Sequence, residues 1–162
     1  MDIKNWKKPF VVMMIGLPGS GKSTWIRENL PGIKVLSTDD YIEQYALSKG
    51  KTYSEVFSKA APLASAKFDQ ELKKAAKNGE SVIIDQTNMG KKSRVNKTAP
   101  FKNHYKVAIM VSADPTELKL RLKHRAEKTG KHIPEKVIDQ MARSFQTITK
   151  DEGWDEIHYI HT

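Results

Sequence analysis

The stretch GLPGSGKSTW, Gly16 to Trp25, directly follows the apolar run FVVMMI and constrains the fold more than any other feature of the chain. Gly16, Gly21, Lys22 and Ser23 satisfy the pattern G-x-x-x-x-G-K-[ST], which is meaningful where a strand precedes it and a helix follows. A glycine-rich turn that binds nothing is the alternative interpretation. Because the flanking residues favour that strand and that helix, the sequence predicts a phosphate-binding loop between them.

Each residue type in this loop has a physical task. Glycines let successive backbone N–H groups turn toward phosphate oxygens, and the helix that follows directs its positive end to the same place. Lys22 can reach the β- and γ-phosphates of a nucleotide, and the Ser23 hydroxyl can ligate Mg²⁺. We therefore expect ATP and Mg²⁺ to bind at Gly16, Pro18, Gly19, Ser20, Gly21, Lys22, Ser23 and Thr24, with Ser23 as the metal ligand.

Short apolar runs alternate with helix-like segments along the rest of the chain. Runs without polar alternation are typical of strands covered on both faces, and they are Phe10 to Ile15, Lys34 to Leu36, Val82 to Asp85 and Val107 to Val111. Glu156 to His161 is expected to add a last strand. Helices are predicted over Ser23 to Leu30, Thr52 to Asn78, Pro115 to Gly130 and Pro134 to Phe145.

The alternation of strands and helices predicts a three-layer α/β/α fold of the P-loop NTPase type, with a mostly parallel central sheet. Thr52 and Glu55 form a capping-box pattern at the start of the longest helix, and Pro62 is expected to kink or split that helix. We expect one domain over residues 1–162, with a small helical lid at approximately residues 121–134.

The composition limits the class of protein. Apolar residues make up 38% of the chain and no run is long enough to span a membrane, so we expect a soluble, cytoplasmic protein with no membrane partner. The sequence has no cysteine, which excludes disulfides and thiolate metal sites. The net charge of +9 favours an anionic partner such as nucleic acid, although many basic proteins merely have basic surfaces.

Polar side chains follow two of the predicted strands. Asp39 comes after the second strand, where a carboxylate can accept the proton of an attacking hydroxyl; the alternative is an acid that only stabilises a helix N-terminus. Asp85, Thr87 and Asn88 come at the end of the third strand, where they can hold substrate or a water on the metal. A turn built from side-chain hydrogen bonds is the alternative for this second group.

Several basic residues are candidates for binding phosphate. Arg121 and Arg125 are four residues apart, so they share one face of a predicted helix and can neutralise charge on a transferred phosphoryl group. A solvated basic face is the alternative. Arg94 belongs to a run with Lys91, Lys92 and Lys97 after the third strand, and this run is a candidate anion-attracting rim for substrate.

Taken in order, these motifs resemble the polynucleotide 5′-hydroxyl kinase family, and its bacteriophage members in particular. The resemblance covers nearly the whole chain and rests on the phosphate loop together with STDDY (37–41), DQTN (85–88), the pair Arg121 and Arg125, GKHIP (130–134) and EGW (152–154). It implies phosphoryl transfer from ATP to a 5′-hydroxyl end of DNA or RNA. Asp39 then matches the general base, Lys22 and Arg125 match transition-state stabilisers, and Arg121 assists.

The sequence also departs from that family. Ile42 stands where the related bacteriophage kinase has an arginine associated with the 3′-phosphate of the acceptor. Similar motifs, especially Asp85 to Asn88 and Gly130 to Pro134, resemble those of the kinase-like domain of heterogeneous nuclear ribonucleoprotein U, and a related group of phage kinases acts on hydroxymethyl pyrimidines within DNA. A kinase of another hydroxyl, such as a modified base or a small metabolite, and a binding module without turnover therefore stay open as alternatives.

Overall fold

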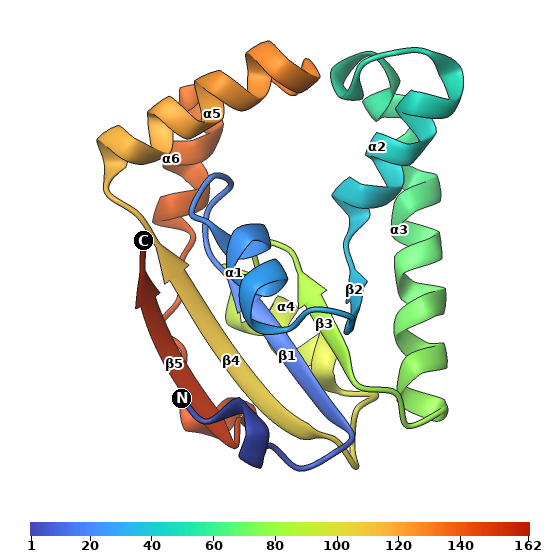
Figure 1. Ribbon diagram of the computed structural model, residues 1–162, viewed down its shortest axis with the longest axis vertical. Helices are drawn as coiled ribbons and strands as arrows, with labels where there is room; N and C mark the ends of the chain where they lie inside the picture. Colours follow the sequence, from blue (N-terminus) through green and yellow to red (C-terminus); the bar gives the residue numbers. More distant parts are fainter.

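The computed structural model describes residues 1–162 and has a central sheet of five strands, all of them parallel (Figure 1). The order of the strands across the sheet is β2-β3-β1-β4-β5. This confirms the predicted α/β class, and the sheet, which was predicted to be mostly parallel, is parallel throughout. The strands are β1 (Phe10–Ile15), β2 (Lys34–Leu36), β3 (Val82–Asp85), β4 (Tyr105–Ser112) and β5 (Glu156–His161).

Six α-helices connect and cover these strands. They are α1 (Lys22–Asn29), α2 (Thr38–Lys49), α3 (Tyr53–Lys77), α4 (Lys91–Thr98), α5 (Pro115–Thr129) and α6 (Glu135–Arg143), with 3₁₀ turns at Ile3–Asn5 and Lys150–Glu152. The parallel strands all end at the same edge of the sheet, where α5 and α6 lie on one side and α2 with the start of α3 on the other (Figure 1). None of the helices is long and apolar enough to cross a membrane.

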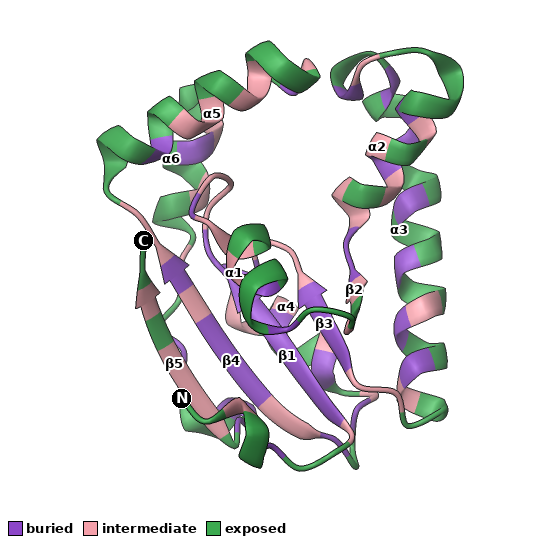
Figure 2. Ribbon diagram, in the orientation of Figure 1, coloured by how far each residue is buried: buried purple, intermediate pink, exposed green.

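The core has two halves because β1 is buried on both faces. Met13 and Ile15 point to one face and pack with Phe68 of α3 and with Phe101, which follows α4. Val12 and Met14 point to the opposite face, where they pack with Ile26 of α1. All six β1 residues are buried, as Figure 2 shows for the centre of the sheet, so the uninterrupted apolar run is explained by helices on both sides.

The structure corrects two expectations about helices. Pro62 lies inside α3, which runs unbroken from Tyr53 to Lys77, so it does not split the helix. Ala60 and Ala64 on either side of this proline are buried against α2, and Thr52 forms the predicted capping box with Glu55 at the start of α3. This packing and the cap offset the roughly 3 kcal/mol that an interior proline costs. The basic run after β3 is the helix α4, which the sequence analysis did not predict.

Candidate active site

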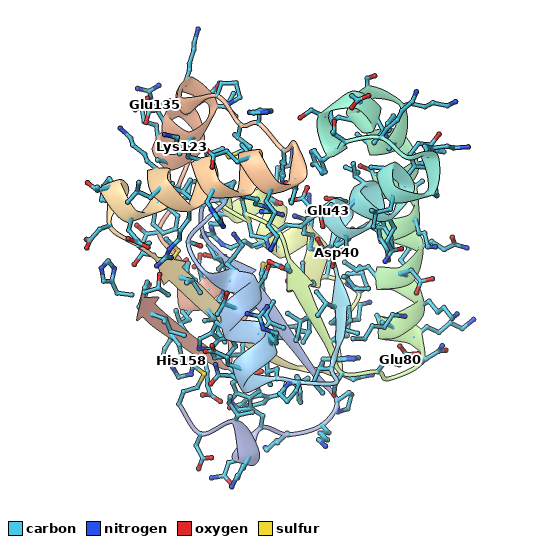
Figure 3. The ribbon with its side chains drawn as sticks, turned by 45° about the horizontal axis from the view of Figure 1, so that its top comes forward. Asp40, Glu43, Glu80, Lys123, Glu135 and His158 are labelled. Atoms are coloured by element: carbon cyan, nitrogen blue, oxygen red, sulfur yellow. The ribbon has the colours of Figure 1, made fainter.

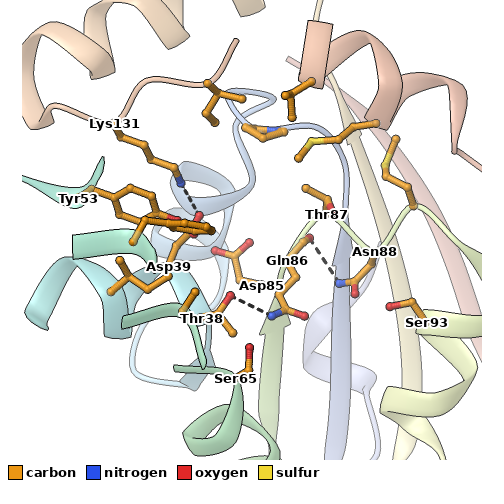
Figure 4. A pocket seen from close by; sticks show the side chains of 18 of the residues that line it. Thr38, Asp39, Tyr53, Ser65, Asp85, Gln86, Thr87, Asn88, Ser93 and Lys131 are labelled. Atoms are coloured by element: carbon orange, nitrogen blue, oxygen red, sulfur yellow. Dashed lines mark hydrogen bonds and ion pairs between the residues drawn. The ribbon is translucent and has the colours of Figure 1, made fainter. Parts of the chain in front are cut away.

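A cavity of about 840 Å³ opens at the carboxyl ends of β1, β2 and β3. Its walls come from the loop after β1, the start of α2, the first turns of α3, the acceptor loop (residues 86–90, between β3 and α4), α4, and the lid connection (residues 130–134, between α5 and α6). Figure 4 shows its polar side chains. Asp39 and Lys131 face each other from opposite walls, with Asp85 and Thr87 on the sheet side.

The phosphate-binding loop has the backbone that its glycines predict. Gly16 has a φ of 151°, and a Cβ at this position would lie 2.3 Å from the Val111 carbonyl oxygen of β4. No side chain fits there, so glycine is required by close packing as well as by conformation. The N–H of Gly16 donates to the Thr87 carbonyl oxygen at 3.0 Å, which ties this loop to the acceptor loop.

Lys22 is folded back on its own loop. Its Nζ donates to the carbonyl oxygens of Gly16, at 2.8 Å, and Leu17, at 3.0 Å. Burial lowers the pKa of Lys22 to about 8, against the opposing charges of Asp85 and Asp39. Because an anion next to this ammonium would compensate for its lost hydration, the position suits binding of the terminal phosphates.

Ser23 and Asp85 form the part of the site that fits a hard cation. The Ser23 hydroxyl donates to Asp85 Oδ2 at 3.3 Å, so the first turn of α1 and the end of β3 meet there. Burial raises the pKa of Asp85, although the charge of Lys22 acts in the opposite direction. No group of three or more His, Cys, Asp or Glu residues is placed to hold a metal. One hydroxyl and one carboxylate suit Mg²⁺, which takes its other ligands from water and substrate phosphates.

Asp39 lies in the first turn of α2 and its two carboxylate oxygens are both bonded. The Tyr53 hydroxyl donates to Oδ1 at 2.7 Å, and Lys131 Nζ donates to Oδ2 at 2.5 Å. Burial acts to raise the pKa of Asp39, but the charge and hydrogen bond of Lys131 and the hydrogen bond of Tyr53 outweigh it and hold that pKa below its usual value. The capping of this helix, which was the alternative role for Asp39, is provided by Ser37. The side-chain oxygen of Ser37 accepts a hydrogen bond from the Asp40 N–H at 3.4 Å.

Lys131 and Tyr53 are site residues that the sequence analysis did not identify. Lys131 comes from the lid connection and is only 6% exposed, and its Nζ lies 4.6 Å from the centre of the Tyr53 ring. The Lys131 ammonium is therefore held both by the face of the Tyr53 ring and by the Asp39 carboxylate. The GKHIP segment was noted as part of the lid, but nothing in the spacing indicated that its lysine reaches Asp39.

The two arginines of α5 reach different parts of the site. Arg121 Nη1 donates to the Gly19 carbonyl oxygen of the phosphate loop at 3.2 Å and to the Thr162 hydroxyl at 2.9 Å. Arg125 Nη2 donates to Glu43 Oε1 of α2 at 2.9 Å, so this ion pair spans the gap between α5 and α2. Figure 3 shows Glu43 and Asp40 on the side of α2 that faces this gap. The two arginines on one face of α5 therefore contact different elements, Arg121 the phosphate loop and Arg125 the helix α2.

Asn88 lines the cavity but is occupied with holding the acceptor loop. Its φ of 51° is left-handed, a conformation that asparagine tolerates better than most residues. Its Nδ2 donates to the Met14 carbonyl oxygen of β1 at 2.8 Å, and its Oδ1 accepts from Lys97 Nζ at 2.6 Å. Thr87 also lines the cavity, while its carbonyl oxygen accepts from Gly16. The segment is thus both a turn held by side-chain hydrogen bonds and a part of the cavity lining, so the two interpretations of the sequence do not exclude each other.

The prediction that Arg94 binds substrate is wrong. Arg94 is fully buried on the inner face of α4 and lies outside the residues that line the cavity. Its Nε pairs with Glu152 Oε1 at 2.7 Å, and its remaining N–H groups donate to carbonyl oxygens of Asn88, Met89, Gln146 and Thr147. With every donor group used internally, Arg94 fixes the acceptor loop to the segment before β5 rather than contacting a ligand.

Lys97 is the member of the basic run that reaches the cavity. Its only hydrogen bond goes to Asn88, it forms no salt bridge, and its ammonium lies 6.0 Å from the centre of the Phe68 ring. Burial lowers the pKa of Lys97 to about 8, while Asp69 acts weakly in the opposite direction. A half-buried cation that lacks a carboxylate partner makes this wall of the cavity attractive to an anion.

The fold and the loop define the class of the protein: it is a nucleotide-binding α/β domain with a P-loop kinase-like fold. Residues 11–148 match the AAA_33 family model, described as an AAA domain, and the chain belongs to this family.

The known proteins that resemble this chain include nucleic-acid proteins. Human heterogeneous nuclear ribonucleoprotein U-like protein 2 is 29% identical over 158 residues; the match covers 92% of this chain, which spans 21% of that relative's length. A chain in the Pnkp1/Rnl/Hen1 RNA repair complex has a TM-score of 0.63 and 22% identity, over 89% of this chain and 46% of that one. A chain of AvrRxo1-ORF1:-ORF2 with ATP has a TM-score of 0.67 and 14% identity, over 85% and 47% of the two chains.

Proposed function

We propose that this protein is an ATP- and Mg²⁺-dependent kinase that transfers the γ-phosphate to the 5′-hydroxyl end of DNA or RNA. The observation that carries the proposal is the placement of Asp39 on the wall of a nucleotide-sized cavity that also borders the phosphate-binding loop and Asp85. A carboxylate there can take a proton from a hydroxyl that enters from the cavity side.

The reaction follows from this arrangement. The acceptor oxygen bonds to the γ-phosphorus, the bond between that phosphorus and the bridging oxygen of ADP breaks, and the hydroxyl proton passes to Asp39. Lys22 and the loop N–H groups hold the phosphates, and Ser23 with Asp85 would hold Mg²⁺, which when bound neutralises charge on the phosphate oxygens. Arg121, against the phosphate loop, and Arg125, between α5 and α2, would neutralise charge on the transferred group.

Three observations support a polynucleotide as the acceptor. Lys97 presents a cation without a carboxylate partner to the cavity, and the chain carries a net charge of +9. The similarity to a heterogeneous nuclear ribonucleoprotein U-like protein and to a chain of an RNA repair complex points the same way. The phosphates of a nucleic-acid strand would compensate both the charge of Lys97 in the cavity and the net positive charge of the chain.

One observation favours a second candidate, a kinase of a hydroxymethyl base in DNA or of a small metabolite. Ile42 is 2% exposed and lines the cavity at a position where the related phage kinase has an arginine. At this position the wall therefore offers an apolar side chain and no positive charge to a 3′-phosphate. A non-catalytic binding module is disfavoured because the charges of Asp39 and Asp85 both act on Lys22, and Asp85 accepts a hydrogen bond from Ser23, so these four residues lie close together.

The test is transfer of labelled γ-phosphate from ATP to oligonucleotides with free or blocked 5′ ends, with and without hydroxymethyl pyrimidines. Label on free 5′-hydroxyl ends alone supports the proposal. Label on blocked ends moves the acceptor to a base, and absence of label on every DNA and RNA, with transfer to a small hydroxyl compound, overturns it. Asp39→Asn should lose transfer, whereas Asp40→Asn, at the exposed neighbouring position, should keep it.

A further inference from the structure

The Asp39 carboxylate is paired in this structure with a lysine from the lid connection. Tyr53 donates to Oδ1 and Lys131 donates to Oδ2, so each carboxylate oxygen already accepts one hydrogen bond from the protein. The exposure of the two partners differs: Lys131 retains 5% of its side-chain surface and Asp39 retains 43%. The ion pair is thus covered on the lysine side and open on the carboxylate side, where a substrate would approach.

The lid connection that carries Lys131 is docked on the start of α3. The Ser54 hydroxyl donates to the Gly130 carbonyl oxygen at 2.8 Å, and the His132 N–H donates to Ser54 Oγ at 3.4 Å. Gly130 has a φ of 72°, and a Cβ there would lie 2.7 Å from Thr52 Cβ. The two neighbours of Lys131, Gly130 and His132, are therefore both held against the start of α3, and this positions Lys131.

The contact has two consequences for a base. A hydroxyl that is to be deprotonated must donate to a carboxylate oxygen, and both oxygens of Asp39 already accept a hydrogen bond, one of them from an ammonium. The ammonium also makes the carboxylate a weaker base, since it favours the charged form of Asp39. In the presence of ATP alone, a water molecule near the γ-phosphate would therefore meet a weakened base.

We propose that Lys131 is a positioning residue that keeps Asp39 from activating water and releases it only when an acceptor displaces the ammonium, so that ATP is transferred rather than hydrolysed. This inference rests on the proposed kinase function. Water has no other contacts with which to offset the loss of the ion pair. An acceptor that fills the cavity does, because binding of its non-reacting parts can drive the rearrangement.

The decisive experiment compares phosphate release from ATP without acceptor in the wild type, Lys131→Met and Lys131→Arg. We expect Lys131→Met to raise acceptor-independent hydrolysis on the order of tenfold, a part of the roughly 10²- to 10⁴-fold effect of a positioned base. Lys131→Arg keeps a cation on Asp39 and should stay close to the wild type. Lys128→Met is the matched control, because Lys128 is exposed near the end of α5 and has no contact with Asp39; it should leave hydrolysis unchanged.

The pH dependence gives a readout that a merely structural role would not move. The pKa of Asp39 is lowered by Lys131, so removal of the ammonium should shift the acidic limb of the hydrolysis rate to higher pH, while Lys131→Arg should leave it in place. All variants keep the other charged or titratable groups that interact electrostatically with Asp39, which are Tyr53, Arg125, Lys22, Asp40 and Asp85.

Several outcomes separate this inference from the proposed function. Equal hydrolysis by the wild type and Lys131→Met, with the same acidic limb, overturns the inference even if oligonucleotides are phosphorylated. Raised hydrolysis in Lys131→Met supports it even if the acceptor proves not to be nucleic acid. If Lys131→Met does not fold, Ser54→Ala decides: it loosens the lid connection without touching Asp39, and should raise hydrolysis by a smaller factor. No increase in Ser54→Ala would then count against the inference.

Discussion

The two walls of the active site are built in different ways. The donor wall is one continuous stretch, in which the loop after β1 and the first turn of α1 supply Gly16, Lys22 and Ser23 within eight residues of sequence. The acceptor wall is assembled from the starts of α2 and α3, the acceptor loop, α4 and the lid connection. The donor wall therefore depends on one local motif, whereas the composite acceptor wall can be changed one element at a time.

The largest effect should come from Asp39, which belongs to the acceptor wall alone. Asp39→Asn is expected to lower transfer by roughly 10²- to 10⁴-fold, because an amide cannot take the proton. ATP affinity should stay within about twofold of the wild type, since Lys22 and the loop are untouched. The measurement is kcat for transfer beside the Kd for ATP. An equal loss in both would show that the two walls are not separable.

Arg94 tests whether the acceptor wall depends on a buried scaffold. Arg94→Met leaves Glu152 buried without its ionic partner, and this is expected to lower the free energy of unfolding by about 3–5 kcal/mol. The exposed Lys92→Met on the same helix should change it by less than about 0.5 kcal/mol. Denaturant unfolding measures both variants. If Arg94→Met proved as stable as the wild type yet lost acceptor binding, the substrate role would be restored.

Lys97 should distinguish acceptors by charge. Lys97→Met is expected to weaken binding of a phosphate-bearing acceptor about tenfold, the loss of one charge-assisted contact, with no effect on ATP. The wild-type affinity for that acceptor should fall as the pH rises through about 8, because the ammonium is charged below its pKa and neutral above it. Lys97→Arg should keep the affinity and remove this pH dependence. Affinity measured at pH 7 and pH 9 checks both statements.

Tyr53 should have the smallest effect, since it adjusts a base that is already in place. Tyr53→Phe removes the hydrogen bond that orients the Asp39 carboxylate through Oδ1, a contact worth about 1 kcal/mol, so kcat for transfer should fall roughly fivefold even though the carboxylate becomes more basic. The hydroxyl helps to hold the pKa of Asp39 low, so its loss should move the acidic limb of the rate to higher pH. A pH-rate profile of the variant is the measurement. An unchanged profile would mean that Tyr53 serves only to support the Lys131 side chain.

The same contrast explains what the sequence could predict. All five strands and the phosphate loop were predicted, because their signals lie within short stretches: an uninterrupted apolar run, or a fixed spacing of glycines and lysine. Asp39 and Asp85 were found because the ends of parallel strands meet at one edge. Each of these inferences needed only local pattern and the general geometry of a parallel sheet.

The residues that were missed or misassigned depend on contacts between distant segments. Lys131 reaches Asp39 across 92 positions of sequence, and Arg94 reaches Glu152 across 58. Nothing local separates Arg94, which is buried, from Lys97, which lines the cavity on the same helix three residues later. Pro62 was misjudged for the same reason, since the packing of Ala60 and Ala64 on α2 decides the course of α3.

The bond from the Gly16 N–H to the Thr87 carbonyl oxygen, with the bond from Asn88 to Met14, clamps the acceptor loop to the end of β1. The spacing between the phosphate loop and the acceptor loop is therefore set by one backbone bond and by the Asn88 side chain, which Lys97 supports by donating to Asn88 Oδ1. Ile42 stands outside this clamp and contributes only to the wall. New acceptors can thus be admitted by exchanging such wall residues while the line of attack stays fixed, which makes the domain a suitable starting point for redesigning kinase specificity.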